Sequence, residues 1–168
     1  MTTCVYDYRR KVIAADRKNT DSAGAGWETR KIETLPNGWW FLGSGHCRSI
    51  ALARAWAATL FDPDEEPDWE FILEDPDDRD MQCLVISPDG EIVYMINGEL
   101  TPIRVYGDWF AIGSGAPYAI GALHADISAK DAVWIASEYD NNTGMGVDVI
   151  YLNDLIYRND LNTNPSTP

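Results

Sequence analysis

The second residue of the chain is a threonine that directly follows the initiator methionine. Initiator methionine is normally removed when so small a residue follows it, and Thr2 would then carry a free α-amine. Such a residue holds a nucleophilic hydroxyl and a base together, because an α-amine with a pKa of about 7.7–8.0 accepts a proton near neutral pH. Thr2 could therefore act as a nucleophile without a distant histidine. Every chain that begins Met-Thr meets this condition, so the flanking residues decide whether it has meaning.

Several segments downstream of Thr2 combine short apolar runs with polar residues or glycines at their ends. They are Val12-Ile13-Ala14-Ala15-Asp16, Thr29-Arg30-Lys31-Ile32, Phe41-Leu42-Gly43-Ser44-Gly45, Ala111-Ile112-Gly113-Ser114-Gly115-Ala116-Pro117-Tyr118-Ala119 and Asp140-Asn141-Asn142-Thr143-Gly144.

Together with the opening Thr2-Thr3-x-Val5, these segments resemble the proteasome β subunits and HslV. In that family a nucleophilic threonine, a buried aspartate and a lysine occur in this order and at nearly this spacing. The Gly-Ser-Gly-x-Pro-Tyr-Ala block is also a family element, and the resemblance runs from residue 2 to about residue 152. It implies an α+β fold, the four-layer αββα sandwich of N-terminal nucleophile hydrolases.

The resemblance also implies a role for each matching residue. Lys31 would lower the proton affinity of the Thr2 hydroxyl and amine by like charge. Asp16 would be the counter-charge of Lys31, since an unpaired buried cation is costly. The backbone N–H of Gly43 would face the developing oxyanion, a contribution of about 3 kcal/mol. Hydrogen bonds to the Thr2 amine and a water would come from the remaining set, Ser114, Asp140 and Thr143.

Each of these residues also has a purely structural interpretation. Asp16 could form a turn, Lys31 could be a solvated strand residue, and Gly43 could permit a tight turn between a strand and a helix. Ser114 could cap the following helix, and Asp140 could close a helix-to-loop turn. Taken singly, the structural interpretation is favoured for each. Their order behind a threonine at residue 2 favours the catalytic interpretation. Thr143 is the weakest member, because serine is usual there.

The resemblance places a substrate pocket beside the nucleophile, lined from the strands that carry Lys31 and Gly43. The matching positions are Asn19, Thr29, Phe41 and Gly45, none of which is charged. Burying an unpaired charge there would cost several kcal/mol. We therefore expect a preference for uncharged, apolar side chains before the scissile bond. The alternative is that these residues only pack the sheet.

Other chemistry is not supported by the sequence. His46 and His124 are the only histidines, and His124 falls on an expected helix with no cysteine or carboxylate at metal-ligand spacing, so no metal or cofactor is predicted. Cys4 is expected to be a small buried hydrophobe rather than a nucleophile. The glycine-rich block lacks the lysine of a phosphate-binding loop.

The elements that must position these residues follow from hydrophobic patterning. Residues 17–26 are polar and small, which is typical of a loop. Expected strands cover residues 2–8, 12–16, 28–35, 39–42, 81–87, 91–96 and 147–152, with two more strand-like runs before Gly113, and expected helices cover 50–61, 117–125 and 130–139. This order indicates an α+β layered domain.

Composition narrows the class of protein. The chain of 168 residues is 45% hydrophobic, enough for one domain over residues 1–157, followed by a polar tail over 158–168. The net charge of −14 argues against nucleic-acid binding, and no stretch approaches the length of apolar residues needed to span a membrane. An odd number of scattered cysteines favours a reduced, cytoplasmic setting. The acidic run over 62–80 is interpreted as a solvated loop in preference to a docking surface.

The family resemblance completes the functional expectation. It implies a cytoplasmic threonine endopeptidase that forms a ring, or stacked rings, of identical subunits and cleaves peptides or unfolded proteins. An ATP-dependent unfoldase is a possible partner. The family's long charged helical pair after the glycine strand is interrupted here by Pro63 and Pro67, so docking built on that region is not carried over. The alternative is an assembly protein of this kind without peptidase activity, which a retained Met1 or an outward-pointing Lys31 would favour.

Overall fold

The computed structural model of the chain describes residues 2–20, 24–69, 80–98 and 100–154. Within them lie a four-stranded sheet in the order β10-β1-β2-β11 and a five-stranded sheet in the order β5-β6-β7-β8-β9. A separate two-stranded hairpin pairs β3 (Lys18–Thr20) with β4 (Gly26–Glu28). All strand pairs are antiparallel.

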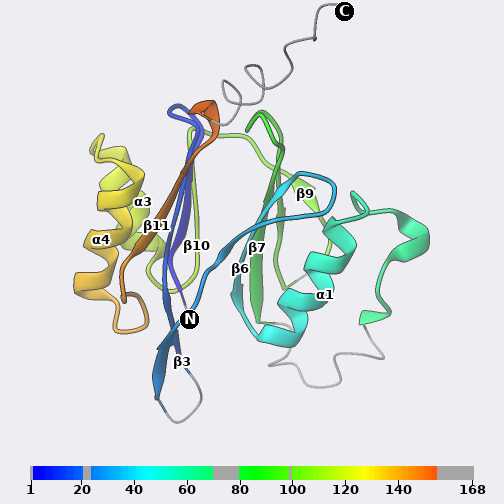
Figure 1. Ribbon diagram of the computed structural model, residues 1–168, viewed down its shortest axis with the longest axis horizontal. Helices are drawn as coiled ribbons and strands as arrows, with labels where there is room; N and C mark the ends of the chain where they lie inside the picture. The colour runs from blue at the N-terminus through cyan, green and yellow to red at the C-terminus, as the bar shows by residue number, and fades with distance from the viewer. Residues whose placement is uncertain (1, 21–23, 70–79, 99, 155–168) are drawn as a thin grey trace, which may run out of the picture.

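The four-stranded sheet is built on the first hairpin of the chain. Strand β1 (Cys4–Asp7) pairs with β2 (Val12–Asp16) on one side and with β10 (Trp109–Ile112) on the other. Strand β11 (Val147–Tyr151) extends the sheet beyond β2. Helices α3 (Ala116–His124) and α4 (Ala129–Tyr139) cover its outer face, seen beside β11 in Figure 1.

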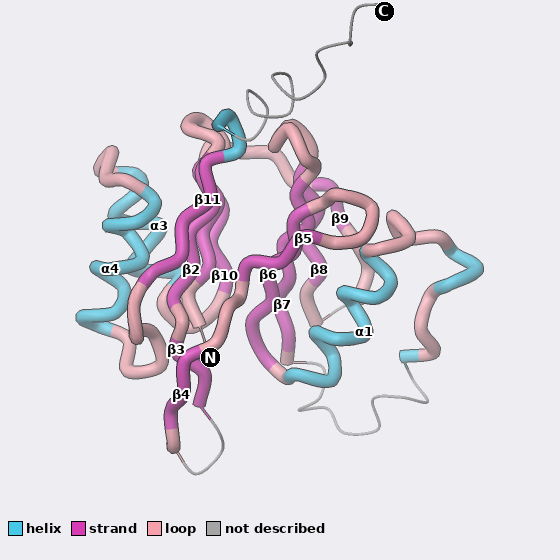
Figure 2. Tube along the Cα trace, viewed as in Figure 1, coloured by secondary structure: helices cyan, strands magenta, loops and turns pink. Residues whose placement is uncertain are grey.

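The five-stranded sheet faces the first one and carries α1 on its own outer face. Its strands are β5 (Ile32–Thr34), β6 (Trp40–Gly45), β7 (Met81–Ile86), β8 (Val93–Ile96) and β9 (Ile103–Arg104). Helix α1 (Cys47–Ala57) packs on β6 and β7, and a short 3₁₀ helix, η1, covers Pro63–Glu65. Figure 2 shows the two sheets side by side, with helices on their outer faces.

Strand alternation explains how this layering buries apolar residues on both faces of each sheet. In β2, Ile13 and Ala15 contribute to the core between the sheets, whereas Val12 and Ala14 pack against α3 and α4. In β7, Leu84 and Ile86 face the first sheet, and Cys83 and Val85 face α1. The continuous apolar runs in the sequence are therefore strands that are covered on both sides.

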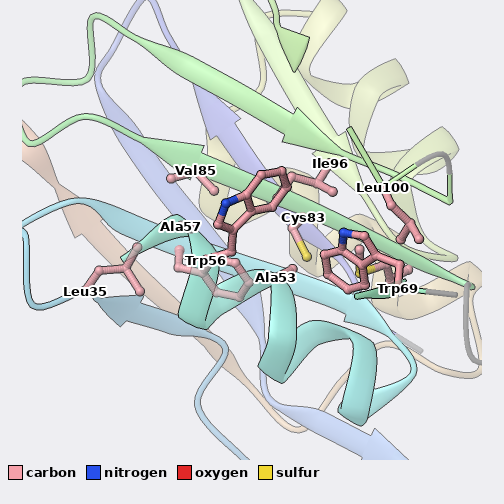
Figure 3. Packing of buried hydrophobic residues seen from close by; sticks show 11 residues of the cluster. Leu35, Ala53, Trp56, Ala57, Trp69, Cys83, Val85, Ile96 and Leu100 are labelled. Carbon is pink, nitrogen blue, oxygen red and sulfur yellow. The ribbon is translucent and has the colours of Figure 1, made fainter. Parts of the chain in front are cut away.

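The core beneath α1 is rich in large aromatic rings. Trp56 of α1 packs edge-on against Trp69, with ring centroids 6.3 Å apart (Figure 3). Trp39 packs against this cluster, but its neighbour Trp40 points to the opposite face and joins the core between the sheets. Phe61 and Trp69, which flank the two prolines in the sequence, both pack against Trp56.

Most of the predicted elements are present, with three corrections. The expected loop over residues 17–26 contains β3 and the first residue of β4. The expected strand over 28–35 is interrupted at residues 29–31, where the chain passes from the hairpin to the second sheet. Helix α1 ends at Ala57 rather than at Phe61, because Leu60 and Phe61 have positive φ angles of 56° and 63°.

Two further expectations concern regions at the margins of the fold. Residues 70–79 of the acidic run and the expected tail over 158–168 lie outside the described residues. Among the described helices, none combines the length and the apolar character needed to cross a lipid bilayer.

Candidate active site

The two threonines that precede β1 point to opposite sides of the first sheet. Side chains alternate along a strand, and Cys4 and Tyr6 face the second sheet while Val5 faces the helices. Continued backwards, this alternation turns Thr2 toward the second sheet and Thr3 toward α3 and α4. The observed contacts agree, because Thr2 meets Lys31 from the second sheet's side and Thr3 meets Thr143 beyond α4.

Asp16 ends β2 directly opposite Thr3 and is fully buried. Its Oδ1 accepts hydrogen bonds from the Thr2 hydroxyl at 2.6 Å, the Thr3 N–H at 2.9 Å and the Lys31 ammonium at 2.7 Å. Its Oδ2 accepts from the backbone N–H groups of Lys18 and Gly144, each at 3.0 Å. Asp16 is therefore a buried carboxylate that is paired with the ammonium of Lys31 and also accepts from the turn that follows β2.

Lys31 lies in the interrupted segment between β4 and β5, and its side chain is 8% exposed. An ammonium has three N–H donors, and all three are used here. One hydrogen bond reaches the Thr2 hydroxyl oxygen, one reaches Asp16, and one reaches the carbonyl oxygen of Lys18 at 2.5 Å. The break in the expected strand is thus where the chain turns this side chain toward Thr2.

Gly43 lies on β6, in a part of the strand that extends past the end of β5. Strand β5 begins at Ile32, opposite Leu42, so Gly43 and Gly45 lie beyond that pairing. A Cβ atom on Gly43 would come within 2.6 Å of the Ile50 side chain of α1, so only glycine fits beneath the helix. The open edge of β6 and Thr2 line the same pocket.

A second polar cluster holds Thr3. Asp140, which follows α4, accepts hydrogen bonds from the hydroxyls of Ser114 at 2.5 Å and Thr143 at 2.6 Å. The Thr143 hydroxyl has one hydrogen, which it donates to Asp140, so its 2.6 Å contact with Thr3 is donated by Thr3. Among the described residues, the hydrogen-bonded cluster of Ser114, Asp140 and Thr143 contacts Thr3, through the hydroxyl of Thr143, and makes no hydrogen bond to Thr2.

The hydrogen bonds of this second cluster stabilise a charged Asp140. Burial opposes the charge and would raise the pKa of the carboxyl. The bonds donated by Ser114, Thr143 and the backbone N–H of Asn142 outweigh burial and lower the pKa below its ordinary value.

The backbone of the N-terminal segment packs closely against the glycine-rich loop after β10. Gly113 has a φ of 94°, and a Cβ atom there would lie 2.0 Å from the carbonyl oxygen of Thr2. Any other residue would push Thr2 away from Asp16 and Lys31. A glycine is needed at position 113 because the backbone of Thr2 packs directly against it.

All four predicted pocket residues lie around one pocket with Thr2, Lys31 and Gly43. They are Asn19, Thr29, Phe41 and Gly45. The sequence did not identify the other lining residues, which are Arg30, Glu33, Ser44, Cys47 and Ile50. Alternation from Lys31 could have indicated Glu33, whereas Cys47 and Ile50 arrive with α1 and have no local signal. The pocket is therefore more charged than expected, although the carboxylate of Glu33 is paired with Arg54 at 2.7 Å.

Ser44 and Gly45 also line a second hollow, together with Asp80, Gln82, Gly113 and Ser114. The two hollows share this wall, with Thr2 lining the first and Ser114 lining the second.

Cys4 is buried between the sheets, as expected. Burial raises the pKa of its thiol to about 12, which leaves almost no nucleophilic thiolate near neutral pH.

Comparison with solved structures identifies the architecture. The crystal structure of eukaryotic HslV from Trypanosoma brucei superposes with a TM-score of 0.67 at 21% identity, covering 89% of this chain and 98% of HslV. The chain has the HslV fold. Thiobacillus denitrificans BPH matches with a TM-score of 0.62 at 21% identity, covering 90% of this chain and 97% of BPH. BPH in complex with epoxomicin also gives 0.62, at 18% identity, with 90% and 99% covered.

At the level of sequence, no family model matches the chain, and no curated protein does. The HslV fold is therefore recognised through its three-dimensional arrangement, and the roles of the residues must be argued from their contacts.

Proposed function

We propose that the chain is a threonine endopeptidase whose nucleophile is the hydroxyl of Thr2, exposed together with its α-amine when Met1 is removed. The observation that carries the proposal is the position of the Thr2 hydroxyl. It lies between a buried lysine and a buried aspartate, at the wall of a pocket. Burying a charged pair costs free energy of desolvation unless its hydrogen bonds are well satisfied. A lysine with only a structural role would therefore be expected to remain in solvent.

The reaction follows from these contacts. The Thr2 oxygen attacks the scissile carbonyl carbon while its proton passes to the α-amine. The ammonium of Lys31 stabilises the negative charge that develops on the attacking oxygen, and the N–H of Gly43 is the proposed donor to the oxyanion. Collapse of the tetrahedral intermediate breaks the C–N bond, and the Thr2 ammonium returns a proton to the departing amine. Water then hydrolyses the ester, which regenerates the free hydroxyl and releases a carboxylic acid.

The Asp140 cluster has a supporting role in this proposal. Thr143 accepts a hydrogen bond from the Thr3 hydroxyl and donates one to Asp140, and this chain of bonds is proposed to position the segment that begins with Thr2. Ser114, on the same carboxylate, is the group proposed to hold the amine and the hydrolytic water after Met1 has left.

The pocket is proposed to bind the side chain that precedes the scissile bond. Phe41 and Ile50 supply apolar surface, the charge of Glu33 is balanced by Arg54, and Arg30 is exposed to solvent. Uncharged apolar side chains are therefore the proposed substrates, in peptides or unfolded proteins.

The remaining assignments extend the family resemblance. We propose that the layers described above are the four-layer αββα sandwich of N-terminal nucleophile hydrolases, and that residues 1–157 form a single domain. The subunit is proposed to assemble with identical copies into a self-compartmentalising ring in the cytoplasm, fed by an ATP-dependent unfoldase.

The alternative is an assembly protein of the same fold without peptidase activity. An outward-pointing Lys31 would have favoured it. Lys31 instead donates to the Thr2 hydroxyl, which supports the peptidase.

Intact-mass measurement after incubation with epoxomicin, the ligand of BPH, tests the proposal directly. The expected result is a chain that has lost Met1 and carries one inhibitor, with no adduct on Thr2→Ala. A native chain that retains Met1 and takes up no inhibitor would instead establish the alternative.

A further inference from the structure

The hairpin of β3 and β4 carries a large aromatic side chain close to the proposed active site. Figure 2 shows this hairpin extending past the ends of both sheets, beside the N-terminus. Trp27, in the middle of β4, is 47% exposed. Trp27 belongs to none of the three core clusters of the described residues, so its ring does not serve the packing of that core.

The strand register places Trp27 on the pocket side of the hairpin. Trp27 is directly opposite Asn19, so both side chains point to the same face. Pairing continues past β4, because the Thr29 N–H donates to the Arg17 carbonyl oxygen at 2.8 Å. Thr29, two residues after Trp27, therefore shares that face as well. Asn19 and Thr29 both line the pocket beside Thr2.

The opposite face of the hairpin is occupied by a different set of contacts. This face carries Lys18, whose side chain approaches Gly26 together with that of Met145, and Glu28, which is directly opposite Lys18. Trp27 is thus the large apolar group on the pocket face.

The hairpin is anchored to the groups that hold the nucleophile. The Lys18 carbonyl oxygen accepts a hydrogen bond from Lys31, and the Lys18 ammonium donates to the Asn141 carbonyl oxygen at 2.5 Å. The N–H groups of Arg17 and Lys18 both donate to the carbonyl oxygen of Gly144 at 3.0 Å. The position of Trp27 relative to Thr2 is therefore set by the same contacts that set Lys31.

The distance along the hairpin matches the repeat of an extended peptide. A strand rises about 3.3 Å per residue, so Trp27 and Thr29 lie roughly 7 Å apart along it, as do side chains two residues apart in an extended substrate. Moving from Lys31 to Thr29 to Trp27 leads away from the nucleophile. The second hollow, which Ser114 lines, is available to the part of the substrate that follows the scissile bond.

We propose that Trp27 contacts the substrate as an aromatic platform for the side chain two residues before the one that enters the pocket. The proposal rests on the proposed peptidase function and deepens it, because it selects peptides with a large apolar side chain, aromatic above all, at that position. Aromatic and aliphatic groups gain both area burial and ring contacts on such a surface.

Fluorogenic peptides with leucine before the scissile bond and phenylalanine, alanine or aspartate two residues earlier provide the test. The parent should prefer phenylalanine to alanine, and aspartate should be the poorest. Trp27→Ala should lower kcat/KM for the phenylalanine peptide about fivefold to tenfold and leave the alanine peptide within about twofold. Trp27→Phe should restore most of the preference. Trp134→Ala, at a 58% exposed tryptophan on α4, is the matched control and should change neither.

Binding separates this inference from the proposed reaction. In a Thr2→Ala background, which is expected to bind without cleaving, Trp27→Ala should weaken the Kd of the phenylalanine peptide by the same factor. If these Kd values shift as expected but the parent cleaves no peptide, the peptidase proposal fails and the platform stands. If the parent cleaves peptides and Trp27→Ala leaves the preference unchanged, the platform is wrong. A Trp27→Ala protein whose mass by light scattering falls to that of a smaller assembly would assign Trp27 to a contact between copies and overturn the inference.

Discussion

Two buried carboxylates flank the N-terminal threonine pair, and they are held in different ways. Asp16 accepts two side-chain hydrogen bonds, from Thr2 and Lys31, in addition to three from backbone N–H groups. Asp140 accepts from two hydroxyls and one backbone N–H, and no salt bridge to it is found in the described part of the chain. In the described residues, Asp16 is paired with a cation, and Asp140 is held by hydroxyls and a backbone N–H.

The two carboxylates have different partners because their clusters lie on opposite sides of the first sheet. The Asp16 cluster joins the first sheet to the second, and its lysine reaches the hydroxyl that is proposed to react. The Asp140 cluster joins the sheet to the loops beside α3 and α4, and its contact with the threonine pair is through Thr3. Changes at Asp16 should therefore affect chemistry and stability together, whereas changes at Asp140 should act through position.

The largest effect is expected from Thr2→Ala, which removes the reacting hydroxyl. The activity on fluorogenic peptides should fall by more than about 10³-fold, in line with the loss of other catalytic nucleophiles. Thr2→Ser keeps a hydroxyl and an amine and should retain part of the activity. Light scattering should show an unchanged assembly. Parent-like turnover by Thr2→Ala would remove the Asp16 cluster from the chemistry altogether.

Lys31→Ala should reduce peptide cleavage nearly as far, because no other described cation contacts the Thr2 hydroxyl. The variant also leaves the Asp16 carboxylate buried without its counter-charge, so the thermal midpoint should fall. Lys130→Ala, at an exposed position on α4, is the control and should alter neither quantity. An active Lys31→Ala protein would mean that the lysine is only structural.

Asp16→Asn should lower activity less than Lys31→Ala but cost more stability than a surface change. The amide cannot balance the charge of Lys31, and breaking a buried pair typically costs about 3–5 kcal/mol. Denaturant unfolding measures this loss. Asp126→Asn, which breaks the exposed pair with Arg10 at 2.5 Å, is the control and should cause no measurable change. Equal stability of the two variants would contradict the assignment of Asp16 as a buried counter-charge.

Asp140→Asn should reduce activity about tenfold and stability by about 1–3 kcal/mol, because two hydroxyls lose their charged acceptor. The lowered pKa of Asp140 adds a pH signature. A carboxyl whose folded pKa lies below its ordinary value of 3.8 contributes stability above that value and loses it as the pH falls through the folded pKa. The parent should therefore lose stability more steeply than Asp140→Asn below about pH 4. Parallel curves for the two proteins would show that Asp140 carries no such linkage.

The sequence predicted the chemical groups of the site better than their connections. Asp16, Lys31 and Gly43 could be identified because their types and order match a known pattern, and the structure brings them together around Thr2. The hairpin of β3 and β4 was missed, because its residues are polar and small and its pairing depends on anchoring to Gly144 rather than on apolar alternation. Contacts between distant segments leave no local periodicity.

Thr3 shows the same limit at the scale of one residue. The sequence pattern indicated only that Thr3 follows the proposed nucleophile, and it predicted no partner for the Thr3 hydroxyl. Its hydroxyl is committed to Thr143, which lies 140 positions away in the sequence. Strand alternation predicts that Thr3 faces away from Thr2, but the partner on that side is known only from the packing of α4.

The smallest effect is expected from Thr143→Ser, which tests whether the unusual threonine matters for its hydroxyl or for its methyl group. Serine keeps the hydroxyl that accepts from Thr3 and donates to Asp140 at 2.6 Å, so activity should stay within about twofold of the parent. The lost methyl group should cost less than about 1 kcal/mol in denaturant unfolding. Thr143→Val is the matched variant, because it keeps the shape and removes the hydroxyl. It leaves the buried Thr3 hydroxyl without its acceptor and should cost about 1–3 kcal/mol. If serine proves as damaging as valine, the methyl packing rather than the hydrogen-bonded chain positions Thr3, and the Asp140 cluster acts through shape alone.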